Sequence, residues 1–244
     1  MINFSTVFWA LVGGFIPAIL WLIFWLREDR KNPESNSLII KTFLAGSLMV
    51  ILVLPFQIYV NNTFPGMGIV AFMLWATIEE SFKFFAAYFV AIRTREDNES
   101  IDPMIYMITA ALGFVALENA LFIINPLIQK DILNGVITGN MRFIGSSLLH
   151  TVSSGTIGIA MAFNFYKPKT KRIFWELLAF GLAVALHTIF NIFIVNQSDF
   201  GTFLTFGIVW AGITLLILMF EKVKSINLQN IDDEISTADT TLEN

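Results

Sequence analysis

The sequence predicts an all-α protein, a polytopic membrane helical bundle of about seven transmembrane helices with its N-terminus outside. Three observations lead to this fold class. First, 56% of the 244 residues are hydrophobic and only 14% are charged, whereas soluble domains usually carry about 25% charged residues. Second, apolar stretches long enough to cross a bilayer recur along the chain. Third, lysine and arginine residues concentrate in alternate connections between these stretches.

Seven apolar stretches have the roughly 20 residues that a membrane-spanning helix requires. Polar or helix-breaking segments separate them, such as residues 61–66 (Asn-Asn-Thr-Phe-Pro-Gly) and 167–169 (Lys-Pro-Lys). Residues 129–141 are only moderately polar, and we expect a short surface helix there. The expected spans are residues 5–26, 37–60, 67–92, 103–128, 142–165, 172–196 and 201–220.

The basic residues predict the orientation of the bundle, because lysine and arginine are enriched in short cytoplasmic loops. The connections after the first, third, fifth and seventh spans are basic, whereas the alternate connections hold only Lys130 and Arg142. We therefore expect one transmembrane domain, residues 1–221, and a cytoplasmic acidic tail, residues 222–244, whose polar composition is typical of disorder. The basic residues on the expected cytoplasmic side are Arg27, Arg30, Lys31, Arg93, Arg95, Lys167, Lys169, Lys171, Arg172, Lys222 and Lys224.

Two histidines and three glutamates lie inside the expected spans, where such groups are costly and usually functional. We counted each residue from the outer end of its span at 1.5 Å per residue. All five fall within a slab about 8 Å thick in the outer half of the membrane. Scattered polar residues would not share a depth, so the sequence predicts one site. The five residues are Glu79, Glu80, Glu118, His150 and His187.

Further polar residues accompany this layer. Lys83 follows the two neighbouring glutamates by four and three positions and can pair with either, as a charge partner or as part of the site. Asn191 follows His187 by four positions, and it could orient the imidazole or donate to a developing oxyanion. Asn119 favours an interhelical hydrogen bond, and the small residues at 153–155 favour close helix packing.

Two histidines together with carboxylates suit a borderline metal such as Zn²⁺, because the chain has no cysteine. His150, His187 and one glutamate would leave an open position for water, and a second glutamate would act as the general base. The same groups also support a mechanism without metal, in which a glutamate activates water and a histidine or Asn191 stabilises the tetrahedral intermediate. Either version hydrolyses an amide or an ester.

Two alternative hypotheses assign the chain to other classes of protein than a hydrolase. Chains of glutamate, histidine and lysine inside helices also conduct protons, as in transporters and proton relays. Transporters often have inverted repeats and helices broken by proline near the binding site. This sequence shows no inverted repeat, and no proline lies beside the polar layer. A scaffold that keeps the polar residues only for helix packing is the other alternative.

Four short motifs of this polar layer resemble those of the PrsW family of intramembrane proteases, within the superfamily of CAAX prenyl endopeptidases and Abi proteins. The motifs occur in order on consecutive expected spans, over residues 67–196. Glutamate stands at position 118, where the CAAX enzymes carry histidine, so the resemblance is to PrsW. The motifs are Glu79-Glu80-Ser-Phe-Lys83, Phe114-Val-Ala-Leu-Glu118-Asn119, His150, and His187-Thr-Ile-Phe-Asn191.

The resemblance implies a multi-pass protease of the cell membrane. It also implies the lipid bilayer and a membrane-anchored protein substrate as partners, an anti-sigma factor being one candidate, and no nucleic acid. The cut would lie near the outer leaflet. From the residue chemistry and the resemblance together, we assign catalysis to Glu79, Glu80, His187 and Asn191, a zinc ion to Glu118, His150 and His187, and supporting roles to Lys83 and Asn119.

Overall fold

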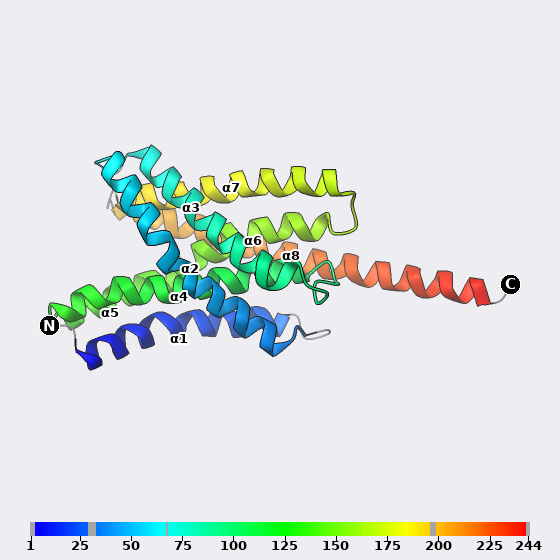
Figure 1. The fold of residues 1–244 in the computed structure, drawn as a ribbon, viewed down its shortest axis with the longest axis horizontal. Helices are drawn as coiled ribbons and strands as arrows, with labels where there is room; N and C mark the ends of the chain where they lie inside the picture. Colours follow the sequence, from blue (N-terminus) through cyan, green and yellow to red (C-terminus); the bar gives the residue numbers. More distant parts are fainter. Residues whose placement is uncertain (1–2, 29–32, 67, 196–198, 243–244) are drawn as a thin grey trace.

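The computed structural model describes residues 3–28, 33–66, 68–195 and 199–242, which form helices and their connections and contain no strand (Figure 1). Two π-helical turns, η1 and η2, adjoin α3 and α6. The elements in order are α1 (Phe4–Glu28), α2 (Asn36–Thr63), α3 (Ile69–Ala87), η1 (Tyr88–Ile92), α4 (Asp102–Ile128), α5 (Ile132–Met141), η2 (Arg142–Ser146), α6 (Ser147–Phe163), α7 (Lys169–Val195) and α8 (Asp199–Leu242).

The polytopic helical bundle that the sequence predicts is confirmed, with a difference in two spans. Within the described residues, five helices are long and apolar enough to cross a membrane: α1, α2, α4, α7 and the part of α8 from Phe203 to Ser225. The third and fifth expected spans are also helical, but α3 has 19 residues and carries three charged ones, and α6 has 17. Most of α6 is buried by other helices, so it needs less apolar surface than a lipid-exposed span.

Two segments outside the expected spans are also helical. The short surface helix expected within residues 129–141 is present as α5. The backbone of α8 continues as a helix to Leu242, and the disorder expected of residues 222–244 stays a prediction. That segment contains no proline or glycine that would end a helix. The cytoplasmic position of residues 222–244 stays a prediction.

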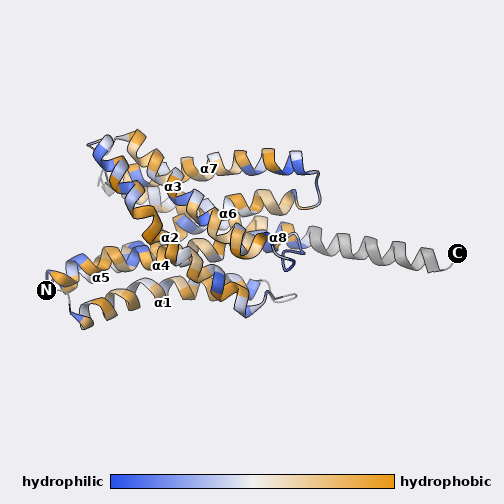
Figure 2. Ribbon diagram, viewed as in Figure 1, coloured by the Kyte–Doolittle hydropathy of each residue, from blue (hydrophilic) through white to orange (hydrophobic). Residues whose placement is uncertain are grey.

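Helix α4 forms the centre of the bundle, and α1, α2 and α6 pack against it (Figure 1). Nearly every side chain from its start to Ala116 is buried. Most of each surrounding helix consists of hydrophobic residues (Figure 2), and many large hydrophobic side chains of these helices are exposed. An apolar exterior around a packed centre is the distribution that a protein surrounded by lipid requires.

Helices α2 and α4 approach each other so closely that glycine is required at the crossing. A Cβ atom added to Gly46 would collide with the carbonyl oxygen of Ala110, and one added to Gly113 would collide with that of Phe43. Ser47 donates a hydrogen bond from its hydroxyl to the Gly113 carbonyl across the same crossing, at 2.7 Å. Small residues allow this contact between membrane helices, and the contact fixes the part of α4 that leads to the polar layer.

Candidate active site

The structure brings the five ionisable residues of the predicted layer together in the middle of the bundle. Helix α3 supplies Glu79 and Glu80, α4 supplies Glu118, α6 supplies His150 and α7 supplies His187. All except Glu118 are at most 4% exposed. The two imidazole rings meet edge to face, with their centroids 4.9 Å apart. Buried charged groups are stable only when they are paired and hydrogen-bonded, so their partners define what each residue can do.

Glu80 is the most completely bonded carboxylate of the cluster. Its Oε1 accepts hydrogen bonds from Lys83 Nζ at 2.6 Å, from Ser153 Oγ at 2.8 Å and from His187 Nδ1 at 2.8 Å. Its Oε2 accepts one from Ser154 Oγ, also at 2.8 Å. The serine pair, which the sequence favoured as packing residues, therefore binds a charged group. Both oxygens of Glu80 are occupied, so this carboxylate holds the cluster together.

His187 is oriented by this contact. A carboxylate can only accept, so His187 Nδ1 carries the proton that it shares with Glu80. The Nε2 atom of a neutral imidazole then has a free lone pair, and it faces Glu79 Oε2 at 3.5 Å. A histidine held through one ring nitrogen while the other faces a cavity is the usual arrangement of a metal ligand or a general base.

Glu79 differs from its neighbour in having one unoccupied oxygen. Gln57 of α2 donates a hydrogen bond from Nε2 to Glu79 Oε1 at 2.8 Å. Glu79 Oε2 is buried without a hydrogen-bond partner among the described residues. A buried polar atom without a partner is uncommon, and Glu79 lines the cavity, so this oxygen is available to a bound ligand. No sequence signal pointed to Gln57, because glutamine is not ionisable and lies alone on its span.

His150 is held in the opposite tautomer. Lys83 Nζ lies 2.7 Å from His150 Nδ1, and an ammonium can only donate. In the neutral ring Nε2 therefore carries the proton, and it faces Glu118 Oε2 at 3.2 Å. Lys83 also lies over the ring of Phe114, 5.1 Å from its centroid. The lysine thus pairs with Glu80 and His150, and it has no contact with Glu79 of the kind that spacing alone allowed.

Arg142, from the π-helical turn η2, is a site residue that the sequence did not reveal. It donates to Glu118 Oε2 at 2.5 Å, to Asn119 Oδ1 at 2.6 Å and to Ser146 Oγ at 3.0 Å. Its guanidinium also lies 3.8 Å from the centroid of the Phe122 ring. In the sequence Arg142 is one of two basic residues in the expected external connections, which offered no reason to place it inside the bundle.

The two asparagines of the motifs have different surroundings. Asn119 is 1% exposed and donates from Nδ2 to Ser147 Oγ of α6 at 3.2 Å, besides accepting from Arg142. Asn191 lines the cavity beside the cluster, but no hydrogen bond joins it to His187 among the described residues, because Glu79 and Glu80 face both ring nitrogens. Of its two expected roles, only donation to a bound group is compatible with this position.

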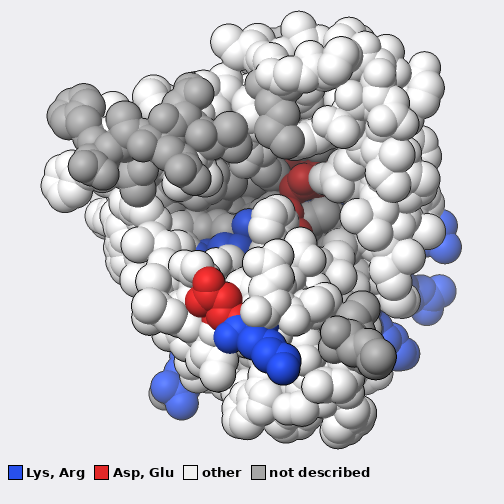
Figure 3. Space-filling view, turned by 90° about the vertical axis from the view of Figure 1, so that its left-hand side faces the viewer, with Lys and Arg blue, Asp and Glu red and all other residues white. Residues whose placement is uncertain are grey.

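A cavity of about 510 Å³ contains the free atoms of the cluster. Its other walls are apolar, and its polar lining consists of Gln57, Glu79, Glu118, Asn125, Arg142, Ser146, His150, His187 and Asn191. Figure 3 looks onto the end of the bundle that carries the N-terminus and α5, and it shows acidic and basic side chains inside a hollow among other residues. A cavity with mostly apolar walls and a few convergent polar groups is typical of a substrate site.

Three of these residues fit a metal ion. One ligand atom from each of Glu79, His150 and His187 lies within 4.8 Å of the others, and all three residues are buried. The unpartnered Glu79 Oε2 and the free Nε2 of His187 support this fit. His150 fits in its other neutral tautomer, in which Nδ1 takes a proton from Lys83 at 2.7 Å and Nε2 gives up its own. The group differs from the expected set in one residue: Glu79 takes the place of Glu118, which Arg142 occupies.

A bundle of membrane-spanning helices with carboxylates, imidazoles and a cavity at its centre fits a membrane-embedded hydrolase. The sequence matches the family model described as "PrsW family intramembrane metalloprotease" over residues 34–220. The chain therefore belongs to the PrsW family. It is a multi-pass protein of the cell membrane and an intramembrane endopeptidase.

Curated relatives agree with this membership over nearly the whole chain. A protein named "Protease PrsW" from Halalkalibacterium halodurans is 26% identical over 229 residues, which cover 92% of this chain and 98% of that protein. Its namesake from Oceanobacillus iheyensis is 31% identical over 198 residues, covering 80% of this chain and 87% of that protein. The one from Bacillus subtilis is 23% identical over 234 residues, covering 92% and 100%. No solved structure matches the chain.

Proposed function

We propose that the protein cleaves a membrane-anchored protein near the outer leaflet, with the cluster around Glu79, His150 and His187 as its reaction centre. The single observation that carries this proposal is the pair of free atoms at the cavity, Glu79 Oε2 and His187 Nε2, 3.5 Å apart. The depth of the cluster in its spans and the basic residues at the opposite end of the bundle support a cut on the external side. An anti-sigma factor, which releases a transcription factor when cut, is the substrate class that we propose to test first.

Among the two carboxylates that line the cavity, we propose Glu79 as the group that takes a proton from water. Its Oε2 is free, whereas Arg142 donates to Glu118 Oε2 and His150 Nε2 faces the same atom. Glu80 keeps His187 in the tautomer whose Nε2 faces the cavity. Arg142 and Asn191 carry N–H donors at the cavity, and such donors stabilise the negative charge that forms on the carbonyl oxygen when a peptide bond is attacked.

The donor set also supports a second version of the mechanism, in which Glu79, His150 and His187 would hold zinc and Glu79 would be a ligand rather than the group that takes the proton. Two imidazoles and one carboxylate are the ligands of several catalytic zinc sites. When bound, zinc would polarise the scissile carbonyl and make a bound water more acidic. The orientation of His187 by Glu80 would serve the same purpose there, because a hydrogen bond to the second ring nitrogen fixes a metal ligand.

The test compares the N-termini of all membrane proteins in cells that express either the active chain or a Glu79→Gln variant. New N-termini on the external side of single-pass proteins should disappear in the variant. Glu176→Gln is the matched control, because Glu176 of α7 pairs among the described residues only with Arg172, at 3.8 Å, and does not line the cavity. The purified protein in vesicles should then cut the substrate so identified. Full activity of Glu79→Gln would reject the assignment.

A further inference from the structure

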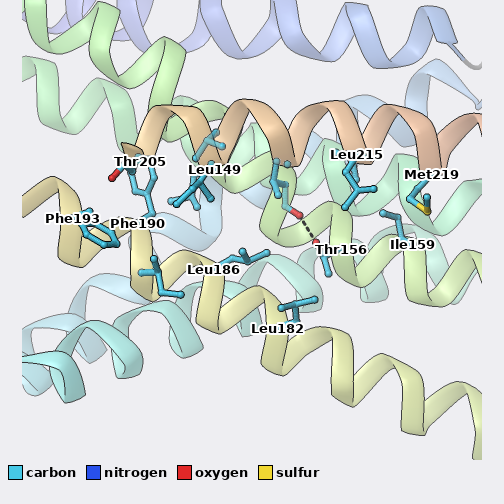
Figure 4. A pocket seen from close by; sticks show the side chains of 16 residues that line it. Leu149, Thr156, Ile159, Leu182, Leu186, Phe190, Phe193, Thr205, Leu215 and Met219 are labelled. Atoms are coloured by element: carbon cyan, nitrogen blue, oxygen red, sulfur yellow. Dashed lines mark hydrogen bonds between the residues drawn. The ribbon is translucent and has the colours of Figure 1, made fainter. Parts of the chain in front are cut away.

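A second cavity, about 450 Å³ in volume, lies between α6, α7 and α8 and forms an apolar groove (Figure 4). Leucine, isoleucine, valine, phenylalanine and methionine side chains from the three helices project into it, together with two threonines. None of the ionisable residues of the active site lines this groove. The peptide bond is therefore not cleaved in this groove, and the groove suits a different part of a bound molecule.

The groove offers no free polar group among the described residues that line it. Thr156 donates its hydroxyl proton to the carbonyl of Val152, and Thr205 donates to that of Gly201, both at 2.7 Å. Each threonine is thus satisfied by its own helix. A lipid headgroup would find no partner here, whereas an apolar peptide segment needs none.

The groove opens on the surface that faces lipid. Leu182 and Ile189 of α7 are 53% and 44% exposed, and Leu215 of α8 is 56% exposed. A segment that diffuses within the bilayer can therefore reach the groove sideways, without passing through water. Its lining along α8 runs from Thr205 to Met219, about 21 Å of helix at 1.5 Å per residue. That length accommodates most of a membrane-spanning helix.

The groove adjoins the catalytic cavity. Leu149 and Phe190 line both spaces, and they are 3% and 7% exposed, so their side chains form the shared wall. Leu149 directly precedes His150 of the catalytic cluster. From this wall the groove follows α6 and α8 toward the end that the basic residues predict to be cytoplasmic. The active site therefore lies at the end of the groove that we predict to be external.

We propose that this groove holds the transmembrane segment of the substrate while the peptide bond at the outer end of that segment enters the catalytic cavity. The inference rests on the proposed function, and it adds what the protein recognises in its substrate. The recognised feature is a continuous apolar helix rather than particular polar side chains. The position of the cut is then measured from the outer end of the apolar segment, because the groove fixes that segment relative to Glu79 and His187.

Crosslinking tests occupancy without any need for catalysis. The probe is a synthetic leucine–alanine peptide of about 20 residues with one central cysteine, placed in vesicles with the full-length chain. Because the chain has no cysteine, Leu215→Cys and its control Leu218→Cys are each the only thiol of the protein. Their parent side chains are 56% and 58% exposed, but only Leu215 lines the groove. On oxidation, Leu215→Cys should give several times more disulfide adduct.

Equal adduct at the two positions, or none at either, would overturn the inference. So would labelling of Leu215→Cys by a photoreactive fatty acyl chain that the peptide does not displace, since a lipid would then be the occupant. These outcomes do not depend on whether the protein cleaves anything.

Cleavage assays separate the groove from the catalytic centre. Leu182→Trp fills the groove, and its control Leu178→Trp adds the same volume one turn away on α7, where the parent side chain is 55% exposed. For the membrane protein identified by N-terminal mapping, Leu182→Trp should raise KM roughly tenfold. Turnover of a short soluble peptide that spans the same cut should not change. Equal loss on both substrates, or no loss, would contradict the groove, whereas a wild-type protein that cuts neither would contradict the proposed function alone.

Discussion

Changing Glu80 to glutamine should destabilise the protein much more than the same change at its neighbour Glu79. The two residues are adjacent in α3 and equally buried, so burial alone predicts equal effects. Their partners differ: four donors bind Glu80, whereas Gln57 alone donates to Glu79. The comparison therefore tests whether Glu80 holds the cluster and Glu79 is free to react.

The magnitude follows from the buried ammonium of Lys83. This side chain is fully buried, and its carboxylate partner Glu80 lies 2.6 Å away. Glutamine removes the negative charge and turns an NH₂ group toward donors, so the ammonium loses its counter-ion. Breaking a buried ion pair from one side costs about 3–5 kcal/mol. Glu79→Gln keeps the oxygen that accepts from Gln57, and its cost should stay near 1 kcal/mol.

The free energy of unfolding can be measured in mixed micelles by titration with a denaturing detergent, with the fluorescence of the six tryptophans as the signal. Glu80→Gln should unfold at markedly lower detergent fraction than Glu79→Gln, which should lose activity but stay folded. In the double variant Glu80→Gln, Lys83→Met much of the stability should return, because no charge is left without a partner. Equal stability of the two single variants would refute this account of the cluster.

Three further predictions concern the crossing of α2 and α4, a loop carboxylate and the metal. Gly113→Ala should lower the free energy of unfolding by about 1–3 kcal/mol, since its Cβ meets the carbonyl of Phe43, whereas Gly181→Ala, which has open space, should not destabilise; equal effects in the same titration would contradict the close crossing. Burial raises the pKa of Asp97, between η1 and α4, to about 7, so the stability that its proton contributes should be present at low pH and lost as pH rises through about 7. The difference in unfolding free energy between wild type and Asp97→Asn, measured from about pH 5 to pH 8, should fall accordingly, and a constant difference would refute it. Chelation should remove both activity and bound zinc, and added zinc should restore both. Elemental analysis of His187→Ala should find the zinc content reduced. Full turnover by protein stripped of metal would contradict the zinc site and favour the mechanism without metal.

The sequence predicted the helical bundle and the common depth of the ionisable residues, because both depend only on distances along the chain. Apolar length predicts spans, and the distance of a residue from the end of its span predicts its depth. Counting residues along each span was therefore enough to place Glu79, Glu118, His150 and His187 at one level. The α3 and α6 spans were the least regular: α3 carries three charged residues, and α6 is short and mostly buried by other helices, so it has no need of a long apolar surface.

The roles of individual residues could not be predicted in this way, since they depend on rotation about each helix axis. Adjacent glutamates point about 100° apart, so one faces Ser153 and Ser154 and the other faces the cavity. Spacing along the chain allowed Lys83 to pair with either Glu79 or Glu80. In the structure it pairs with Glu80, and it also contacts His150 of α6. Gln57 carries no charge that marks it as functional, and Arg142 lies where loop counting assigns it to the surface.

The π-helical turn η2 determines which face of its helix Arg142 occupies. Arg142 and His150 are eight positions apart, and in a regular α-helix eight residues leave side chains about 80° out of line. The wide turn absorbs one residue, so the pair behaves as if seven apart, close to two complete turns. Both side chains can then meet the same oxygen of Glu118. The number of residues between them therefore matters to the site, and deletion of one residue between them should move the guanidinium away from Glu118 although no partner of Glu118 is removed.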